Sequence, residues 1–128
     1  MKTTSIIPQN TLPLTPAVFH ILLALTDGAR HGYAIMREVA ESTNRQINLG
    51  PGTLYGTIKR LLKAEMIEES DERPAATEDD ERRRYYRLTA LGRRVVEAEA
   101  CRYNDVAKLV RQKQLAGKLT KAISAGGI

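Results

Sequence analysis

The hydrophobic residues between Asn48 and Glu65 recur with the period of an α-helix. Leu54, Ile58, Leu61 and Leu62 fall on one face, and the opposite face holds Gly52, Gly56, Lys59, Arg60 and Lys63. Pro51 follows Gly50 and suits the first position of a helix, so a helix is predicted to begin there. One face of this helix should be buried, and the other should be open and basic, as in a helix that enters the major groove of DNA.

Two further helices are predicted before this segment. The first helix is predicted to begin at Thr15 and Pro16 and to end near Asp27 and Gly28. Its hydrophobic face consists of Val18, Ile21, Leu22 and Leu25, and Phe19 and Leu23 widen this face. Residues 33–43 then place Ala34, Ile35 and Val39 on one face of a shorter helix. Residues 46–49 alternate polar and apolar side chains, which predicts a brief strand. The short connection between the second and third helices is typical of a helix-turn-helix.

Beyond Glu65 the pattern changes to that of β-strands. Residues 66–73 and 82–89 fit the two strands of an antiparallel hairpin, with a polar loop at 74–81. Such a hairpin after a helix-turn-helix is a wing, although an ordinary surface hairpin with solvated charges fits the same pattern. Arg82, Arg83 and Arg84 should attract phosphates, whereas the loop acids should point away from DNA; these acids are Glu78, Asp79, Asp80 and Glu81.

A long final helix is predicted to begin after Thr89 and to run to about residue 115. Its apolar residues exceed what a small three-helix core can cover. The simplest way to bury these residues is to pack the helix against the same helix of a second copy in a two-fold dimer. The alternative is that the helix packs back on its own domain. The predicted dimer contacts are Val95, Val96, Tyr103, Val106, Leu109 and Val110.

These elements predict a mainly α fold with a small β-hairpin, in which a winged helix-turn-helix domain is followed by a long dimerisation helix. The expected divisions are a flexible arm at 1–13, the DNA-binding domain at 14–89, the dimerisation helix at 90–115 and a flexible tail at 116–128. At 128 residues and 14.2 kDa, one domain with a modest core is expected.

Composition narrows the class of protein. The chain has 42% hydrophobic residues but no apolar run long enough to span a bilayer. Its first residues also lack the pattern of a secretory signal peptide. A cytoplasmic protein without a membrane partner is therefore expected. The net charge of +5 favours polyanionic partners. Much of the surplus lies in residues 90–128, with eight cations and three acids, so charge alone is weak support for DNA binding.

Candidate catalytic and metal-binding residues are sparse. Cys101 is the single cysteine, which excludes an intramolecular disulfide and a cysteine metal cage. It is predicted to be a buried small hydrophobe, with an intermolecular disulfide or a redox sensor as alternatives. His20 and His31 lack metal-ligating partners at suitable spacing. Because no nucleophile, base and orienting group cluster and no phosphate-binding glycine loop occurs, no enzyme activity, cofactor or metal is expected.

Several short motifs occur in a characteristic order. They are His31-Gly32-Tyr33, Gly52-Thr53-Leu54-Tyr55 with Leu61-Leu62, Tyr85-Tyr86-Arg87-Leu88-Thr89, and Gly92. With them, the chain from about Leu14 to about Leu115 resembles the PadR family of bacterial winged-helix transcriptional regulators, specifically the short members with a single C-terminal helix. The acidic loop and the tail after Leu115 lie outside this pattern.

The resemblance implies a homodimer held by its terminal helices, with two recognition helices in successive major grooves of a near-palindromic operator. Thr53, Tyr55, Lys59 and Arg60 match the DNA-facing positions of the family. Together with the basic and wing residues, the expected DNA-binding set is Thr53, Tyr55, Thr57, Lys59, Arg60, Lys63, Arg82, Arg83 and Arg84.

The resemblance also suggests how such a protein is controlled. Several relatives sense phenolic acids or planar drugs between the terminal helix and the core, so a small aromatic effector is a candidate partner. The chain has no Trp, which excludes a sandwich built on a Trp pair. The expected function is repression of transcription by a dimer on double-stranded DNA. The alternative is a winged-helix protein-interaction module without sequence-specific DNA binding, which the acidic wing loop favours and the basic helix face opposes.

Overall fold

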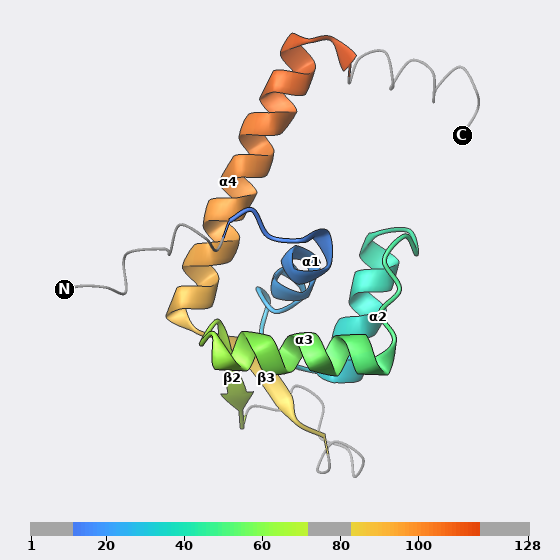
Figure 1. The fold of residues 1–128 in the computed structure, drawn as a ribbon, viewed down its shortest axis with the longest axis vertical. Coiled ribbons are helices and arrows are strands. Elements are labelled where there is room, and N and C mark those ends of the chain that lie inside the picture. The colour runs from blue at the N-terminus through green and yellow to red at the C-terminus, as the bar shows by residue number, and fades with distance from the viewer. Residues whose placement is uncertain (1–11, 72–82, 116–128) are drawn as a thin grey trace, which may run out of the picture.

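The computed structural model describes residues 12–71 and 83–115, which form a mainly helical domain with a small antiparallel sheet (Figure 1). Along the chain the elements are α1 (Pro16–Ala24), β1 (Arg30–His31), α2 (Gly32–Ser42), α3 (Pro51–Lys63), β2 (Ile67–Ser70), β3 (Tyr85–Leu88) and α4 (Ala90–Gln112). The predicted fold class is confirmed, because the three N-terminal helices, the hairpin strands and the long last helix occur in the expected order.

Helix α1 lies at the centre of the core. Its start is capped because Val18 N donates a hydrogen bond of 3.2 Å to Thr15 Oγ1, and Pro16 occupies the first turn. Its buried side chains are Phe19, Ile21, Leu22 and Ala24. They meet buried residues of α2, α3, β2 and the first half of α4 in one hydrophobic cluster, so the hydrophobic stripes of the first three helices face this common centre.

The sheet has three strands in the order β1-β3-β2, and β1 was not predicted. The expected hairpin strands pair from Ile67 opposite Leu88 to Ser70 opposite Tyr85. On the other edge of β3, His31 pairs with Tyr85. Two residues are too few to show an alternating pattern, so only the approach of the β3 edge makes β1 a strand. The loop predicted at 74–81 lies outside the described residues.

The strand predicted at residues 46–49 is wrong, because this segment is irregular. The chain turns before it with positive φ angles of 52° at Asn44 and 65° at Arg45. The amide of Arg45 then bonds to Ala40 O at 2.7 Å, and the amide of Ile47 bonds to Thr43 Oγ1 at 3.1 Å. These local bonds to the end of α2 occupy backbone groups that a sheet partner would need.

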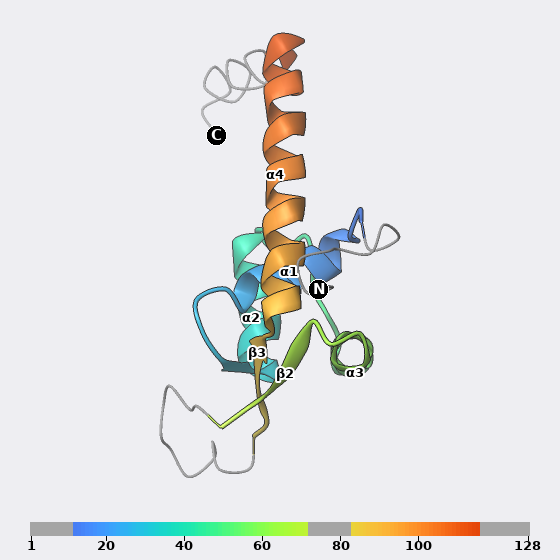
Figure 2. The ribbon, with the colours of Figure 1, turned by 90° about the vertical axis from the view of Figure 1, so that its left-hand side faces the viewer.

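Helix α4 has a packed first half and a projecting second half, which Figures 1 and 2 show as the orange helix leaving the domain. Val95 and Val96 are buried in the protomer's own core. Their prediction as dimer contacts is therefore corrected, because no exposed surface remains on them for a second chain. For this half of the helix, the alternative of packing on its own domain holds.

The second half of α4 is open. Tyr103, Val106 and Leu109 are 40%, 46% and 50% exposed, and Val110 is half-buried. Cys101 is also exposed, so its prediction as a buried hydrophobe is wrong. The periodic pattern had identified the apolar stripe but could not say where along the helix the domain stops covering it.

Glu99 is a buried carboxylate that ties the start of the domain to α4. Leu14 N donates to Glu99 Oε2 at 2.8 Å, and Arg102 donates to both carboxylate oxygens at 2.7 and 3.1 Å. One turn further on, the rings of Phe19 and Tyr103 lie 4.6 Å apart between centroids. These contacts come at the point where α4 leaves the domain, so they set the direction in which the projecting half leaves.

Gly92 is required where the start of α4 packs against the turn between α3 and β2. A Cβ atom at this position would overlap the carbonyl oxygen of Met66 and lie 2.9 Å from its carbonyl carbon. The same Met66 oxygen accepts a 3.0 Å hydrogen bond from Thr89 N, which fixes it in place. Added volume here must shift backbone rather than a flexible side chain.

We therefore expect Gly92→Ala to lower the free energy of unfolding by about 1–3 kcal/mol, because the new methyl group is overpacked. Urea unfolding followed by circular dichroism measures this. Gly56→Ala in α3 is the matched control, since its Cβ would meet only Arg60 Nη1 at 3.9 Å. That substitution should stabilise by about 0.5–1 kcal/mol through helix propensity. Equal effects of the two substitutions would contradict the close contact at Gly92.

Within the described ranges, no helix combines the length and the apolar character needed to cross a membrane.

Candidate nucleic-acid interface

Helix α3 presents a basic face at the periphery of the domain. Figure 2 looks along this helix, which lies beside β2. Leu54, Ile58 and Leu61 are buried, as predicted. Thr53, Tyr55, Lys59, Arg60 and Lys63 are exposed. The 13 residues of α3 include no acid, so the exposed face is uniformly attractive to phosphate.

Thr57 is the one residue of the predicted set on α3 that is turned inward. It is only 4% exposed, and its hydroxyl donates to Thr53 O at 2.8 Å and accepts from Arg60 Nη2 at 3.1 Å. Its prediction as a DNA contact is corrected, because the hydroxyl is covered and engaged within the helix. Thr57 instead holds the guanidinium of Arg60 against the helix surface.

The wing arginines have different surroundings. Arg82 and the four loop acids lie outside the described residues. Arg84 pairs with Glu69 across the hairpin, with 3.0 Å between Nη1 and Oε2, and Arg87 pairs with Glu68 in the same way at 2.8 Å. Arg83 turns to the other side, where its Nη1 lies 2.8 Å from His31 Nε2. The pairing with Glu69 reduces the positive charge that Arg84 offers to a phosphate.

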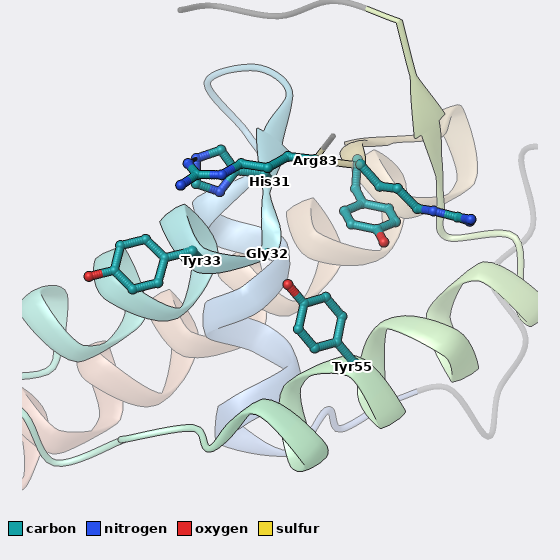
Figure 3. Close-up of a pocket in the computed structure, with 7 residues that line it drawn as sticks. His31, Gly32, Tyr33, Tyr55 and Arg83 are labelled. Carbon is teal, nitrogen blue, oxygen red and sulfur yellow. Dashed lines mark hydrogen bonds between the residues drawn. The ribbon is translucent and has the colours of Figure 1, made fainter. Parts of the chain in front are cut away.

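A pocket of about 450 Å³ lies where α2, α3 and β3 meet (Figure 3). It is lined by His31, Gly32, Tyr33, Tyr55, Arg83, Arg84 and Tyr86. Tyr55, Arg83 and Arg84 belong to the predicted DNA-binding set, and the structure brings them together. The other four were not in that set. Their convergence depends on β1 pairing with β3, for which the sequence gives no signal.

The start of α2 is built around His31 and Gly32. Ala34 N donates to His31 Nδ1 at 3.1 Å, so the imidazole caps the helix. A Cβ atom on Gly32 would lie 2.7 Å from Tyr55 Cζ, so glycine allows the Tyr55 ring to reach the backbone of α2. A polar residue before a helix start could have suggested the cap, but the contact with Tyr55 is tertiary.

Tyr86 contributes a hydroxyl group that remains protonated. Burial raises the pKa of the Tyr86 phenol above its ordinary value, and the negative charge of Glu69 raises this pKa further. The positive charge of Arg84 lowers it by a smaller amount. At neutral pH the group is therefore uncharged and able to donate a hydrogen bond. Among the described residues, no group of three His, Cys, Asp or Glu side chains could hold a metal ion.

Comparison with known proteins identifies a family with this architecture. The model of the transcriptional regulator PadR-like family matches residues 21–98. The crystal structure of a PadR family transcription regulator from Clostridium difficile is similar with a TM-score of 0.64 and 25% identity, over 78% of this chain and 99% of that one.

Two related sequences extend the comparison. Protein X of Lysinibacillus sphaericus is 30% identical over 90 residues, which are 70% of this chain and 80% of that protein. A 37.1 kDa protein of transposon TN4556 from Streptomyces fradiae is 39% identical over 80 residues, and this region spans only 21% of its length. The family match over most of the described domain, together with the agreement in fold, shows that this chain belongs to the PadR-like family of transcriptional regulators.

Proposed function

We propose that the protein acts in the cytoplasm as a homodimeric repressor that binds a near-palindromic operator. The observation that supports this most is the exposed face of α3, which combines Thr53, Lys59 and Arg60 with the absence of any acid in the helix. A helix with small residues near its start and cations along its length can enter a major groove without repelling the backbone.

Different residues would supply affinity and specificity. Lys59 and Arg60 of the exposed face would contact base edges, where an arginine forms paired hydrogen bonds with guanine. For this contact the Arg60 guanidinium would have to leave the Thr57 hydroxyl. Lys63 and Arg83 lie toward the end of α3 and the wing and would contact phosphates. Phosphate contacts set the strength and salt dependence of binding, whereas base contacts select the operator.

The projecting half of α4 supports the dimer. Tyr103, Val106 and Leu109 form an exposed apolar surface that two identical helices could cover around a two-fold axis. A dimer would present two copies of α3, and covering a promoter with both would block transcription. A small aromatic effector would release the protein by favouring a different spacing of the two helices.

Arg60→Ala tests the assignment of base reading to α3. We expect it to cost about 1–3 kcal/mol in binding to the native upstream DNA and much less on a scrambled duplex, because a base contact is lost. Fluorescence-anisotropy titrations at two salt concentrations measure both. Arg111→Gln, at the far end of α4, is the control and should change neither. Weak and equal binding of the unaltered protein to both duplexes would contradict an operator in that DNA.

A further inference from the structure

The start of α2 carries an exposed tyrosine and an exposed arginine that are stacked on each other. The guanidinium carbon of Arg37 lies 5.7 Å from the centroid of the Tyr33 ring, one helical turn away. Tyr33 is 50% exposed, and the Arg37 side chain is 66% exposed. A planar guanidinium stacked on a ring is pre-organised, so less rotamer entropy is lost for each hydrogen bond that it forms with a partner.

The Tyr33 ring is also held from the start of the helix. It lies nearly parallel to the His31 ring, with 14° between the ring planes and 6.4 Å between the centroids. His31 is itself fixed as the cap of α2 by the bond from Ala34 N. Figure 3 shows the Tyr33 hydroxyl at the outer end of the side chain, turned away from Gly32. The ring contacts therefore orient a hydroxyl group on an exposed side chain.

The stacked pair of Tyr33 and Arg37 lies on the same side of the domain as the basic face of α3. Tyr33 lines the pocket of about 450 Å³ together with Tyr55, which is exposed on α3. Figures 1 and 2 show the start of α2 near α3, at the end of the domain opposite to the projecting half of α4. A duplex in contact with α3 would therefore have part of its backbone near the start of α2.

The charges around the stacked pair favour a phosphate. The first turn of α2 contains no acid, and the amide end of the helix carries the positive end of its dipole. Glu38 is paired with Arg30 at 3.1 Å. Glu41 Oε2 lies 4.0 Å from Arg37 Nε, and the Glu41 side chain is 64% exposed, so this ion pair is weak. A phosphate could replace Glu41, because an arginine binds phosphate with two parallel hydrogen bonds.

We propose that Tyr33 and Arg37 bind the phosphate backbone of DNA beside the major groove that α3 enters, the tyrosine through its hydroxyl and the arginine through its guanidinium. The inference rests on the proposed function, because α3 sets the orientation of the DNA. Neither residue belongs to the predicted DNA-binding set. Backbone contacts from α2 would fix the angle at which α3 lies in the groove. They carry no sequence information, so they act on every duplex alike.

Three conservative substitutions in the full chain test this contact. Tyr33→Phe keeps the ring and its stacking and removes the hydroxyl, Arg37→Gln removes the charge, and Arg37→Lys keeps the charge without the planar guanidinium. Binding is titrated against the native upstream DNA and an unrelated duplex over a range of chloride concentrations. We expect Tyr33→Phe and Arg37→Gln each to lose about tenfold in affinity on both duplexes, because a hydrogen bond to a charged group is lost.

The salt dependence separates the two side chains. Arg37→Gln should lower the slope of log affinity against log chloride concentration by about one for each Arg37 in contact, whereas Tyr33→Phe and Arg37→Lys should keep the slope. Arg111→Gln removes the same charge at the far end of α4, so it is the matched control and should change neither affinity nor slope. Unfolding curves that match those of the unaltered protein would show that the losses do not come from unfolding of α2.

The other outcomes are separable. If the unaltered protein binds DNA and Tyr33→Phe and Arg37→Gln bind with the same affinity and slope, the backbone contact is overturned and the proposed function stands. A loss confined to the native upstream DNA overturns it too, because it assigns the residues to base reading. An unchanged slope for Arg37→Gln together with a shifted unfolding curve also overturns it, because the pair then serves only the stability of α2. Failure of the unaltered protein to bind either duplex overturns both proposals.

Discussion

Leu109→Glu is expected to convert the dimer into a monomer and to reduce operator affinity by about 100-fold or more. Leu109 is half exposed on the projecting part of α4. In a two-fold interface the substitution occurs twice, and each buried carboxylate would lack a compensating charge. Loss of the second subunit removes the bivalent contact with two half-sites, which accounts for the size of the effect.

Lys108→Gln is the matched control for this experiment. It changes the charge by the same amount at the neighbouring position, which points to the opposite side of the helix from Val106. Sedimentation equilibrium measures the oligomeric state, and mobility shifts with an operator duplex measure binding. A Leu109→Glu protein that remains dimeric, or a monomer that binds the operator as tightly as the unaltered protein, would contradict the role of α4.

Glu99→Ala is expected to lower the free energy of unfolding by about 2–4 kcal/mol. The change leaves the amide of Leu14 without its acceptor, removes the bidentate partner of Arg102 and opens a cavity beside α4. Glu99→Gln keeps the shape and one acceptor oxygen but not the charge, so it should cost less. Guanidinium unfolding followed by circular dichroism measures both variants.

The pH dependence of the Glu99 contribution has a defined sign. The hydrogen bonds from Arg102 lower the pKa of Glu99 below its ordinary value of 4.5, with a smaller effect of the Leu14 amide, and burial opposes them. A depressed pKa in the folded state means that the stabilisation is complete above 4.5 and is lost as the pH falls through the lower folded value. The stability difference between the unaltered protein and Glu99→Gln should therefore shrink on acidification. A difference that grows as the pH falls would contradict the ion pair with Arg102.

The two faces of α3 could be predicted from the spacing of hydrophobic residues alone. Periodicity predicted that Leu54, Ile58 and Leu61 are buried and that Lys59 and Arg60 are exposed, and the structure confirms it. The angle around a helix axis is a local property, so it follows from spacing. Thr57 was misplaced because a threonine is small and polar enough for either side.

The pocket where α2, α3 and β3 meet shows the opposite case. His31 and Arg83 are 52 residues apart in sequence, and their contact exists because a two-residue strand pairs with the edge of β3. No periodic signal marks so short a strand, and no local rule relates Tyr55 to the start of α2. Such a site becomes visible only when all three elements are placed.

The sequence by itself determined the order of the helices, the starts of α1, α3 and α4, the buried and open faces of α3 and the family to which the chain belongs, because these depend on residues within a few turns of one another. Tertiary structure decided what covers each face. It placed Val95 and Val96 in the protomer's own core, left Leu109 open, and joined Leu14 to Glu99 across 85 residues. The physical reason is that the burial of a side chain depends on which distant part of the chain packs against it. A hydrophobic stripe in the sequence shows only that some other surface must cover it.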